Sequence, residues 1–334
     1  MGLNEVLDIF MKVNGGISTL LNIVIIYMII FKSTVEMKKY KWFLLNNAIW
    51  DLLFNVTVSF LFAPEPILAE LAGALIVTSG LSFLGFEYAK WITMFTNGVL
   101  VGSCAAVCAC FIFRYFCLQS KDTFEKFLSL KVQGLLWFCY GLIIVITLFL
   151  TNMAIVEPLK VIYKFRALRP SITNEFFIAF DISENRWLII AVLWAAGGVG
   201  TMTTINFSCT FLILKKLNSV KMQLSAQTYK MHKELMKALL CQTLSPLLAL
   251  IVPFSGMVFS SALKIELPFG PNWFIFVSTL NAVLNPLFTL YFVKAFWYQI
   301  FPKRRVEPER TTTQPGQNTS QVQTFTSRAS AHVN

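Results

Sequence analysis

Charged residues are scarce in this chain of 334 residues. Asp, Glu, Lys and Arg make up 13% of it, against about a quarter in soluble domains, and hydrophobic residues make up 56%. A soluble fold cannot keep that much apolar surface away from water behind so few charges. The composition therefore predicts a membrane protein whose solvent is the lipid bilayer.

Enzyme and metal-site motifs are also missing. The sequence has neither a P-loop nor a GxGxxG fingerprint, and its two histidines, His232 and His332, lie outside any cluster of metal-ligating residues. We therefore expect no enzymatic activity, no cofactor and no metal site. The net charge of +11 is typical of the basic loops of membrane proteins, so nucleic acid is not an expected partner.

Seven apolar runs are long enough to cross a bilayer as helices. They cover residues 13–31, 43–65, 87–113, 132–151, 187–214, 238–259 and 273–293. Helices satisfy their backbone hydrogen bonds internally, as lipid requires, so we expect an all-α bundle of seven transmembrane helices without strands. An eighth apolar run, 71–86, is shorter and lies between Glu70 and Glu87, which favours an outer loop. The expected organisation is an N-terminal segment 1–12, a bundle 13–301 and a disordered tail 302–334.

Basic residues mark alternate connections between these runs. They concentrate at 32–41, at 114–131, at 215–237 and from Lys294 onward. Lys and Arg beside a span resist translocation, so these segments are expected in the cytoplasm. The protein is then a multi-pass protein of the plasma membrane, with its N-terminus outside and its C-terminus inside. All seven cysteines fall within spans or near their inner ends, so we expect no disulfide bond.

Asp51 is an ionisable residue in the middle of the second span. Such a group costs roughly a few kcal/mol in lipid unless it faces the bundle interior and finds a partner. Asn22 in the first span and Asn285 in the seventh are the expected partners, because amides donate to carboxylates. Two interpretations stay open: a polar clamp holding three helices together, or a polar core that rearranges and holds a sodium ion or a proton.

Arg114 and Tyr115 follow the third apolar run. An arginine at this place either extends to the lipid headgroups or acts as a switch that contacts a cytoplasmic partner. Phe113 precedes Arg114, so no acid at that position is available for an ion pair with a neighbour.

Segment 215–237 is predicted to extend the fifth and sixth spans as helices with basic faces, which bind either lipid headgroups or an acidic partner. Pro246 and Pro253 interrupt the sixth span and Pro286 interrupts the seventh. Proline kinks in these helices act as pivots or are purely structural.

These features together resemble a rhodopsin-like receptor: Asn22, LNNAIWD ending at Asp51, the pair Arg114 and Tyr115, and NPLFTLY from Asn285 to Tyr291. Tyr291 lies two positions later than in the usual NPxxY pattern. A more specific resemblance, over about residues 20–295, is to the nematode serpentine chemoreceptors of the Str superfamily, which include the Str, Srh and Srd families. It rests on MKKYKWFLLN, Pro64-Glu65-Pro66, FIFRYFCL and TYKMHKELMKALLCQTLSPLLALIVP.

The resemblance implies a receptor of sensory neurons, in the ciliary membrane, that binds an odorant or other small molecule and activates a heterotrimeric G protein. It implies an activation role for the polar-core residues Asn22, Asp51, Asn285, Pro286 and Tyr291. It implies G-protein coupling for Arg114, Tyr115, Lys230, Lys233 and Lys237. No feature indicates the oligomeric state. The disulfide that many rhodopsin-like receptors form between the third helix and the second outer loop cannot form here, so packing must hold loop 152–186 or leave it mobile.

The ligand pocket is expected in the outer half of the bundle, where an apolar cavity would suit volatile or weakly polar molecules. Its candidate residues are aromatic, and each is equally suited to anchoring a helix at the membrane interface. They are Trp91, Phe95, Trp194, Phe254 and Trp273.

Three other classes of protein compete with this interpretation. A small-solute transporter would carry internal repeats with matched intramembrane charges, whereas this sequence has a single intramembrane acid and no repeat. A seven-span odorant-gated channel would have its N-terminus inside. A membrane scaffold would tolerate substitution of Asp51 and Arg114 without loss of cell responses.

Overall fold

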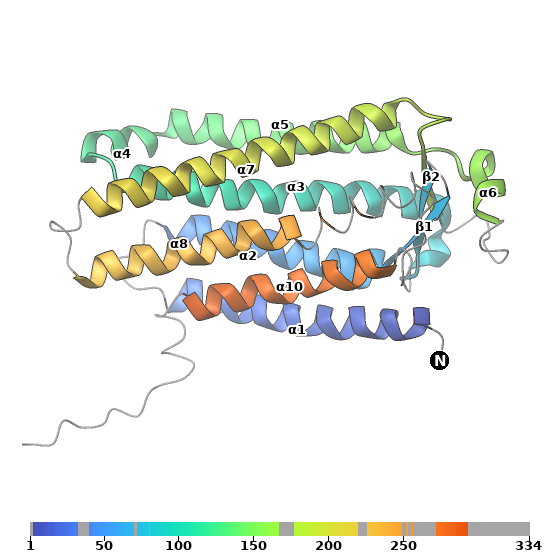
Figure 1. The fold of residues 1–334 in the computed structure, drawn as a ribbon, viewed down its shortest axis with the longest axis horizontal. Coiled ribbons are helices and arrows are strands. Elements are labelled where there is room, and N and C mark those ends of the chain that lie inside the picture. The colour runs from blue at the N-terminus through green and yellow to red at the C-terminus, as the bar shows by residue number, and fades with distance from the viewer. Residues whose placement is uncertain are drawn as a thin grey trace, which may run out of the picture. The chain divides into compact units, whose positions relative to one another are not determined.

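The computed structural model describes residues 3–32, 40–69, 72–79, 81–166, 177–219, 226–248, 252, 256 and 272–292. Seven long helices run alongside one another within these ranges (Figure 1). They are α1 (Leu3–Phe31), α2 (Lys41–Val56), α3 (Gly85–Cys117), α5 (Leu130–Ala154), α7 (Trp187–Ser219), α8 (Ala226–Pro246) and α10 (Asn272–Phe292).

Each of these helices overlaps one of the apolar runs of the sequence. Among the described residues, five helices are long and apolar enough to cross a membrane, and α10 contains a shorter apolar stretch, Ala282–Tyr291. Much of the C-terminal half of the predicted sixth span, 238–259, lies outside the described residues, as do tail residues 302–334. The helical extensions expected in segment 215–237 are the end of α7 and the start of α8.

Helix α3 is the centre of the bundle. It contacts α2, α5, α7 and α8, and 56% of its apolar span is buried, against 17% for α5 and 0% for α7. Helices α2 and α3 approach closely at Gly102, where an added Cβ atom would lie 2.6 Å from the indole of Trp50. These contacts give the buried polar residues of α3 protein partners rather than lipid.

Helix α2 ends earlier than the predicted limit of residue 65. It continues as a π-helical turn, η2 (Thr57–Phe62), and the chain then turns at Ala63, whose φ of 43° lies in the left-handed region. A π-turn places one extra residue in the helix, and such turns often occur at functional sites.

Three strands form beyond that turn. The expectation that the chain has no strands was therefore wrong for the connections between the helices. Strands β1 (Pro64–Ala69), β2 (Ala72–Val77) and β3 (Phe177–Asp181) make an antiparallel sheet in that order. The requirement for helices applies in lipid, whereas these strands lie in connections between the helices. The apolar run 71–86 forms β2, the short helix η3 (Ser82–Leu84) and the start of α3, which confirms that it does not cross the bundle.

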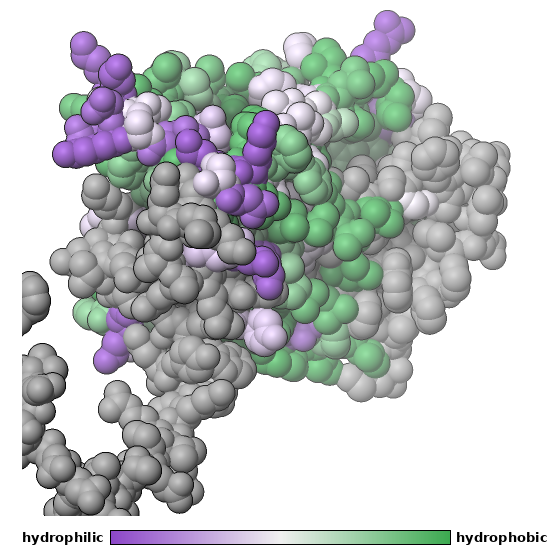
Figure 2. Space-filling view, turned by 60° about the vertical axis from the view of Figure 1, so that its left-hand side comes forward, coloured by the Kyte–Doolittle hydropathy of each residue, from purple (hydrophilic) through white to green (hydrophobic). Residues whose placement is uncertain are grey.

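The two ends of the bundle differ. The sheet lies at one end together with α6 (Pro158–Arg166) and the start of α1, and we call this the sheet end (Figure 1). The opposite end, the Arg114 end, carries α4 (Lys121–Phe127) and the facing ends of α7 and α8. Figure 2, with the Arg114 end turned forward, shows hydrophobic side chains over much of the described surface and hydrophilic ones gathered towards that end.

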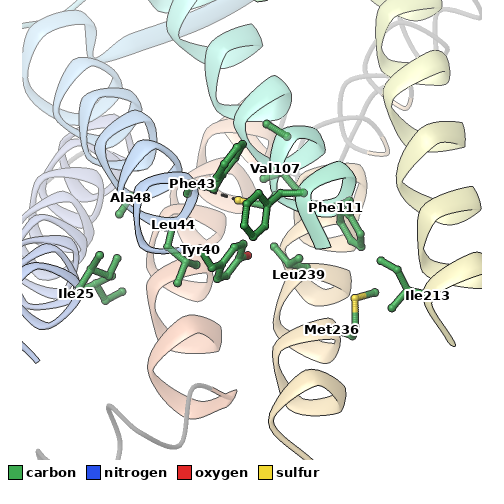
Figure 3. Close-up of a cluster of buried hydrophobic side chains, with 14 of the residues drawn as sticks. Ile25, Tyr40, Phe43, Leu44, Ala48, Val107, Phe111, Ile213, Met236 and Leu239 are labelled. Carbon is green, nitrogen blue, oxygen red and sulfur yellow. Dashed lines mark hydrogen bonds between the residues drawn. The ribbon is translucent and has the colours of Figure 1, made fainter. Parts of the chain in front are cut away.

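The largest group of buried apolar side chains lies towards the Arg114 end. It joins residues of α1, α2, α3, α7, α8 and α10, among them Ile29, Phe43, Phe111, Ile213 and Leu239. Figure 3 shows side chains of α2, α3, α7 and α8 directed towards one another there. A second group, which includes Val161, Phe165 and Phe177, holds α6 against the sheet.

Candidate polar core and Arg114 site

Asp51 is held between α2 and α3. The Ser103 hydroxyl donates to its Oδ1 at 2.7 Å, and the Asn47 amide donates to its Oδ2 at 3.3 Å. These partners differ from the expected Asn22 and Asn285. Asn47 lies one helical turn before Asp51, so the 3.6-residue period would have indicated it, whereas Ser103 comes from a distant segment and carries no local signal.

Asn22 is buried in α1 and bonds within its own helix. Its amide donates to the Ser18 carbonyl at 3.0 Å, and the Ser18 hydroxyl donates to the carbonyl of Ala282 in α10 at 2.5 Å. Because Asn22 uses its donors in this way, it joins α1 to α10 through Ser18 rather than bonding directly to Asp51.

A small cavity nevertheless brings three of the five predicted polar-core residues together, Asn22, Asp51 and Pro286. It has a volume of about 10 Å³, enough for about one water molecule. Asn22, Asp51, Asn47, Pro286 and Thr289 line it, together with apolar residues of α1 and α2. Polar groups from three helices therefore face one small space beside Pro286.

Asn285 lies next to this cavity and is buried, and its side-chain oxygen has no hydrogen-bond partner among the described residues. The backbone carbonyl of Asn285 accepts a hydrogen bond from the Thr289 hydroxyl. The Gln242 amide of α8 donates to the same hydroxyl at 2.7 Å. The polar core thus extends to α8 through Gln242, a residue that sequence reasoning missed. Tyr291, near the end of α10, is 62% exposed.

Arg114 lies in the last turn of α3 and is only 5% exposed, so its side chain does not extend to the surface. Its guanidinium carbon lies 4.1 Å from the centre of the Tyr40 ring. Its Nε makes no hydrogen bond to the described residues. Tyr115 is half-buried and makes an edge contact with Phe116.

The lysines predicted beside Arg114 belong to α8. Lys233 and Lys237 are exposed, while the side chain of Lys230 lies outside the described residues. Lys121, Lys126 and Lys215 are also exposed at this end. The buried arginine is therefore accompanied by an exposed basic surface on α4, α7 and α8.

Three of the five aromatic pocket candidates have described side chains, on α3 and α7. Trp91 and Phe95, one turn apart on α3, are 63% and 47% exposed. The indole of Trp194 in α7 donates to Thr147 in α5 at 3.0 Å. Phe254 lies outside the described residues, and Trp273 is in the first turn of α10 with its side chain outside them.

Noncovalent contacts hold the described parts of segment 152–186, residues 152–166 and 177–186, at the sheet end. Strand β3 pairs with β2, and Lys164 of α6 donates to Asp181 at 2.5 Å. Burial by itself raises the pKa of Asp181, but hydrogen bonds from Lys164 and Ser183 outweigh it and lower that pKa below its ordinary value. The hydrogen bond to Asp181 raises the pKa of Lys164. All seven cysteines are free thiols.

The bundle has seven long helices with α3 at its centre, and polar residues of α1, α2 and α10 face one cavity. This arrangement defines a rhodopsin-like receptor fold. The crystal structure of squid rhodopsin has the same fold, with a TM-score of 0.60 and 17% identity over 90% of this chain and 87% of its own. The family model "Serpentine type 7TM GPCR chemoreceptor Srd" matches residues 7–301, and the chain belongs to that family.

Nematode receptors match over most of their length. Serpentine receptor class delta-40 of Caenorhabditis elegans is 24% identical over 91% of this chain and 94% of its own. G-protein coupled receptor str-217 of the same species is 22% identical over 87% of each chain. The family model selects Srd from the three families that the sequence left open. The protein is a multi-pass membrane protein of a receptor class, not of an enzyme class.

Proposed function

We propose that this protein is a chemosensory receptor that binds a small environmental molecule outside the cell and activates a heterotrimeric G protein inside it. Family membership over residues 7–301 supports the chemosensory part of the proposal. Within this scheme, the ligand binds in the outer half of the bundle, near Trp91, Phe95, Trp194, Phe254 and Trp273. The polar core transmits the change through Asn285, Pro286 and Tyr291.

The basic surface supports the orientation. Lysines of α4, α7 and α8 are exposed at the Arg114 end, and the positive-inside rule places such residues in the cytoplasm. The sheet end then faces outward, as it would in the plasma membrane or in the membrane of a sensory cilium. A cytoplasmic Arg114 end presents Tyr115, Lys230, Lys233 and Lys237 to a partner with an acidic surface.

The observation that carries the proposal is the burial of Arg114 at this basic end of the central helix. A signalling receptor needs an element with two distinct arrangements that a ligand can favour differently. A buried arginine whose Nε lacks a hydrogen bond to the described residues gains by moving to a better partner. In this proposal α3 with Arg114 is such an element, because the same helix carries Ser103, which contacts Asp51 in the polar core.

Two measurements test the proposal. Epitopes at the two termini, stained in intact and permeabilised cells, should show the N-terminus outside and the C-terminus inside. Asn318, the acceptor of an Asn-Thr-Ser glycosylation sequon near the C-terminus, should then be unglycosylated. The reverse orientation would overturn the receptor assignment in favour of the odorant-gated channel. Arg114→Ala should reach the cell surface normally and fail to activate a G protein in response to a ligand found by screening. Unchanged activation in this variant would contradict the role of Arg114.

A further inference from the structure

Tyr40 lies where the first inner connection enters α2. It is the residue directly before the helix and only 7% exposed. Its ring stacks on Phe113, with 5.5 Å between the ring centres. Figure 3 shows its side chain directed from the start of α2 towards α3. Tyr40 therefore belongs to the buried interface between these two helices.

Phe113 anchors this arrangement. It is 1% exposed and contacts Tyr40, Phe43, Phe124 and Phe127 with its ring, so it joins the start of α2 to α3 and α4. An aromatic residue at this position fixes the ring of Tyr40. It offers no carboxylate to the neighbouring Arg114.

Arg114 is restrained by the Tyr40 ring instead of by an acid. No carboxylate of the described residues forms an ion pair with Arg114. The guanidinium carbon lies 4.1 Å from the centre of the Tyr40 ring, within the range of a cation–π contact. The Tyr40 hydroxyl lies near Arg114 and Cys110, but no hydrogen bond of good geometry joins it to the described residues. Cation–π attraction is strongest where water is excluded, as it is here.

We propose that Tyr40 is a positioning residue that holds Arg114 in its buried arrangement, and that the ring must release Arg114 before the G protein couples. The role rests on the proposed function, because it supposes that Arg114 acts on a cytoplasmic partner. The ring belongs to the residue directly before α2, whereas the guanidinium belongs to α3. A relative shift of these helices would therefore break the contact.

Substitutions at Tyr40 separate the ring from the hydroxyl. Tyr40→Leu keeps an apolar side chain but removes the ring, so G-protein activation without ligand should rise by roughly five- to tenfold at equal surface expression. Tyr40→Phe keeps the ring and should retain the parent level. In the Arg114→Ala background, Tyr40→Leu should not raise G-protein activation without ligand. Tyr40→Met replaces Tyr40→Leu if the latter does not reach the membrane.

Phe43→Leu is the matched control. Phe43 is buried in the same cluster and its ring centre lies 4.4 Å from that of Phe113, but it makes no cation–π contact with Arg114. Phe43→Leu should lower the melting temperature without raising G-protein activation in the absence of ligand. An equal rise in activity from Phe43→Leu would mean that loosened packing, not release of Arg114, is responsible, and would overturn the role of Tyr40.

A double-mutant cycle tests the contact without any G protein. The melting temperatures of purified Tyr40→Leu, Arg114→Met and the double variant should be non-additive, and Tyr40→Phe combined with Arg114→Met should behave as Arg114→Met alone. Additive values would overturn the Tyr40 assignment while leaving the proposed function intact. Non-additive values without a G-protein response from the parent would overturn the proposed function and, with it, the role of Tyr40.

Discussion

Asp51 shows how one buried acid joins two helices. Its two oxygens accept hydrogen bonds from Ser103 of α3 and Asn47 of α2. An asparagine at position 51 keeps the shape but has one acceptor oxygen and one donor amide, so one of the two hydrogen bonds is lost. We expect Asp51→Asn to lower the free energy of unfolding by about 1–3 kcal/mol and to change the ligand response at equal surface expression. Thermal unfolding of the purified receptor and a cellular signalling assay provide the two measurements.

Two further variants make this result interpretable. Ser103→Ala removes a single donor and should reproduce much of the loss in melting temperature. Thr204→Val is the neutral control, because the Thr204 hydroxyl is exposed and bonds only to the Gly200 carbonyl of its own helix. A lower melting temperature for Asp51→Asn with an unchanged ligand response would favour the structural clamp over a core that rearranges.

The sequence predicted which residues form this polar core better than it predicted their hydrogen-bond partners. Asn22, Asp51 and Pro286 were identified because polar residues and prolines are conspicuous in apolar runs, and all three line the same cavity. The partner Ser103 was missed because a serine is common in membrane helices and lies far from Asp51 in the chain. Tyr40 was missed because it lies outside the apolar runs.

At the scale of elements, the Lys164–Asp181 contact ties together two parts of segment 152–186. It joins α6 to β3, with Asp181 1% and Lys164 24% exposed in their side chains. Lys164→Ala leaves the buried Asp181 without its cationic partner and should lower both the melting temperature and the amide-exchange protection of residues 177–181. Lys160→Ala is the control, because the Lys160–Glu157 pair is about 60% exposed on both sides and contributes little.

The effect of Lys164→Ala should depend on pH in a defined direction. The pKa of Asp181 is lowered in the folded protein, so its contribution is present above the ordinary value of about 3.9 and is lost as pH falls through the lowered value. The pKa of Lys164 is raised, so its contribution is present below about 10.4 and is lost as pH rises through the raised value. The difference in melting temperature from the parent should therefore be largest near neutral pH. A constant difference across this range would mean that packing alone is responsible.

Hydropathy predicted helices far better than strands. The span expected at 132–151 corresponds to α5 (Leu130–Ala154), because lipid imposes a length and a composition on every crossing segment. The sheet obeys no such local rule. Strand β2 pairs with β3 across about a hundred residues of sequence, and Ala72 faces Asp181 only in the folded bundle. Long-range pairing of this kind leaves little trace in local composition.

At the scale of the whole molecule, the exposed apolar surface defines where lipid surrounds the bundle. Helix α5 provides two leucines to test it: Leu130 at its first residue, 89% exposed, and Leu142 near its middle, 46% exposed. A lysine in the middle of a membrane helix costs about 2.5–3.5 kcal/mol in insertion, whereas a lysine at the end reaches the headgroups. Leu142→Lys should therefore sharply reduce the receptor in the membrane fraction, and Leu130→Lys should leave it nearly unchanged.

The comparison depends on depth rather than on packing, because both leucine side chains face outward from the bundle. Leu142→Phe controls for the change in shape and should insert normally, since it keeps the side chain apolar. If Leu142→Lys reached the membrane as well as Leu130→Lys, the outer face of α5 would have to lie against water or another polar surface. The placement of α5 as a lipid-facing helix at the edge of the bundle would then be wrong.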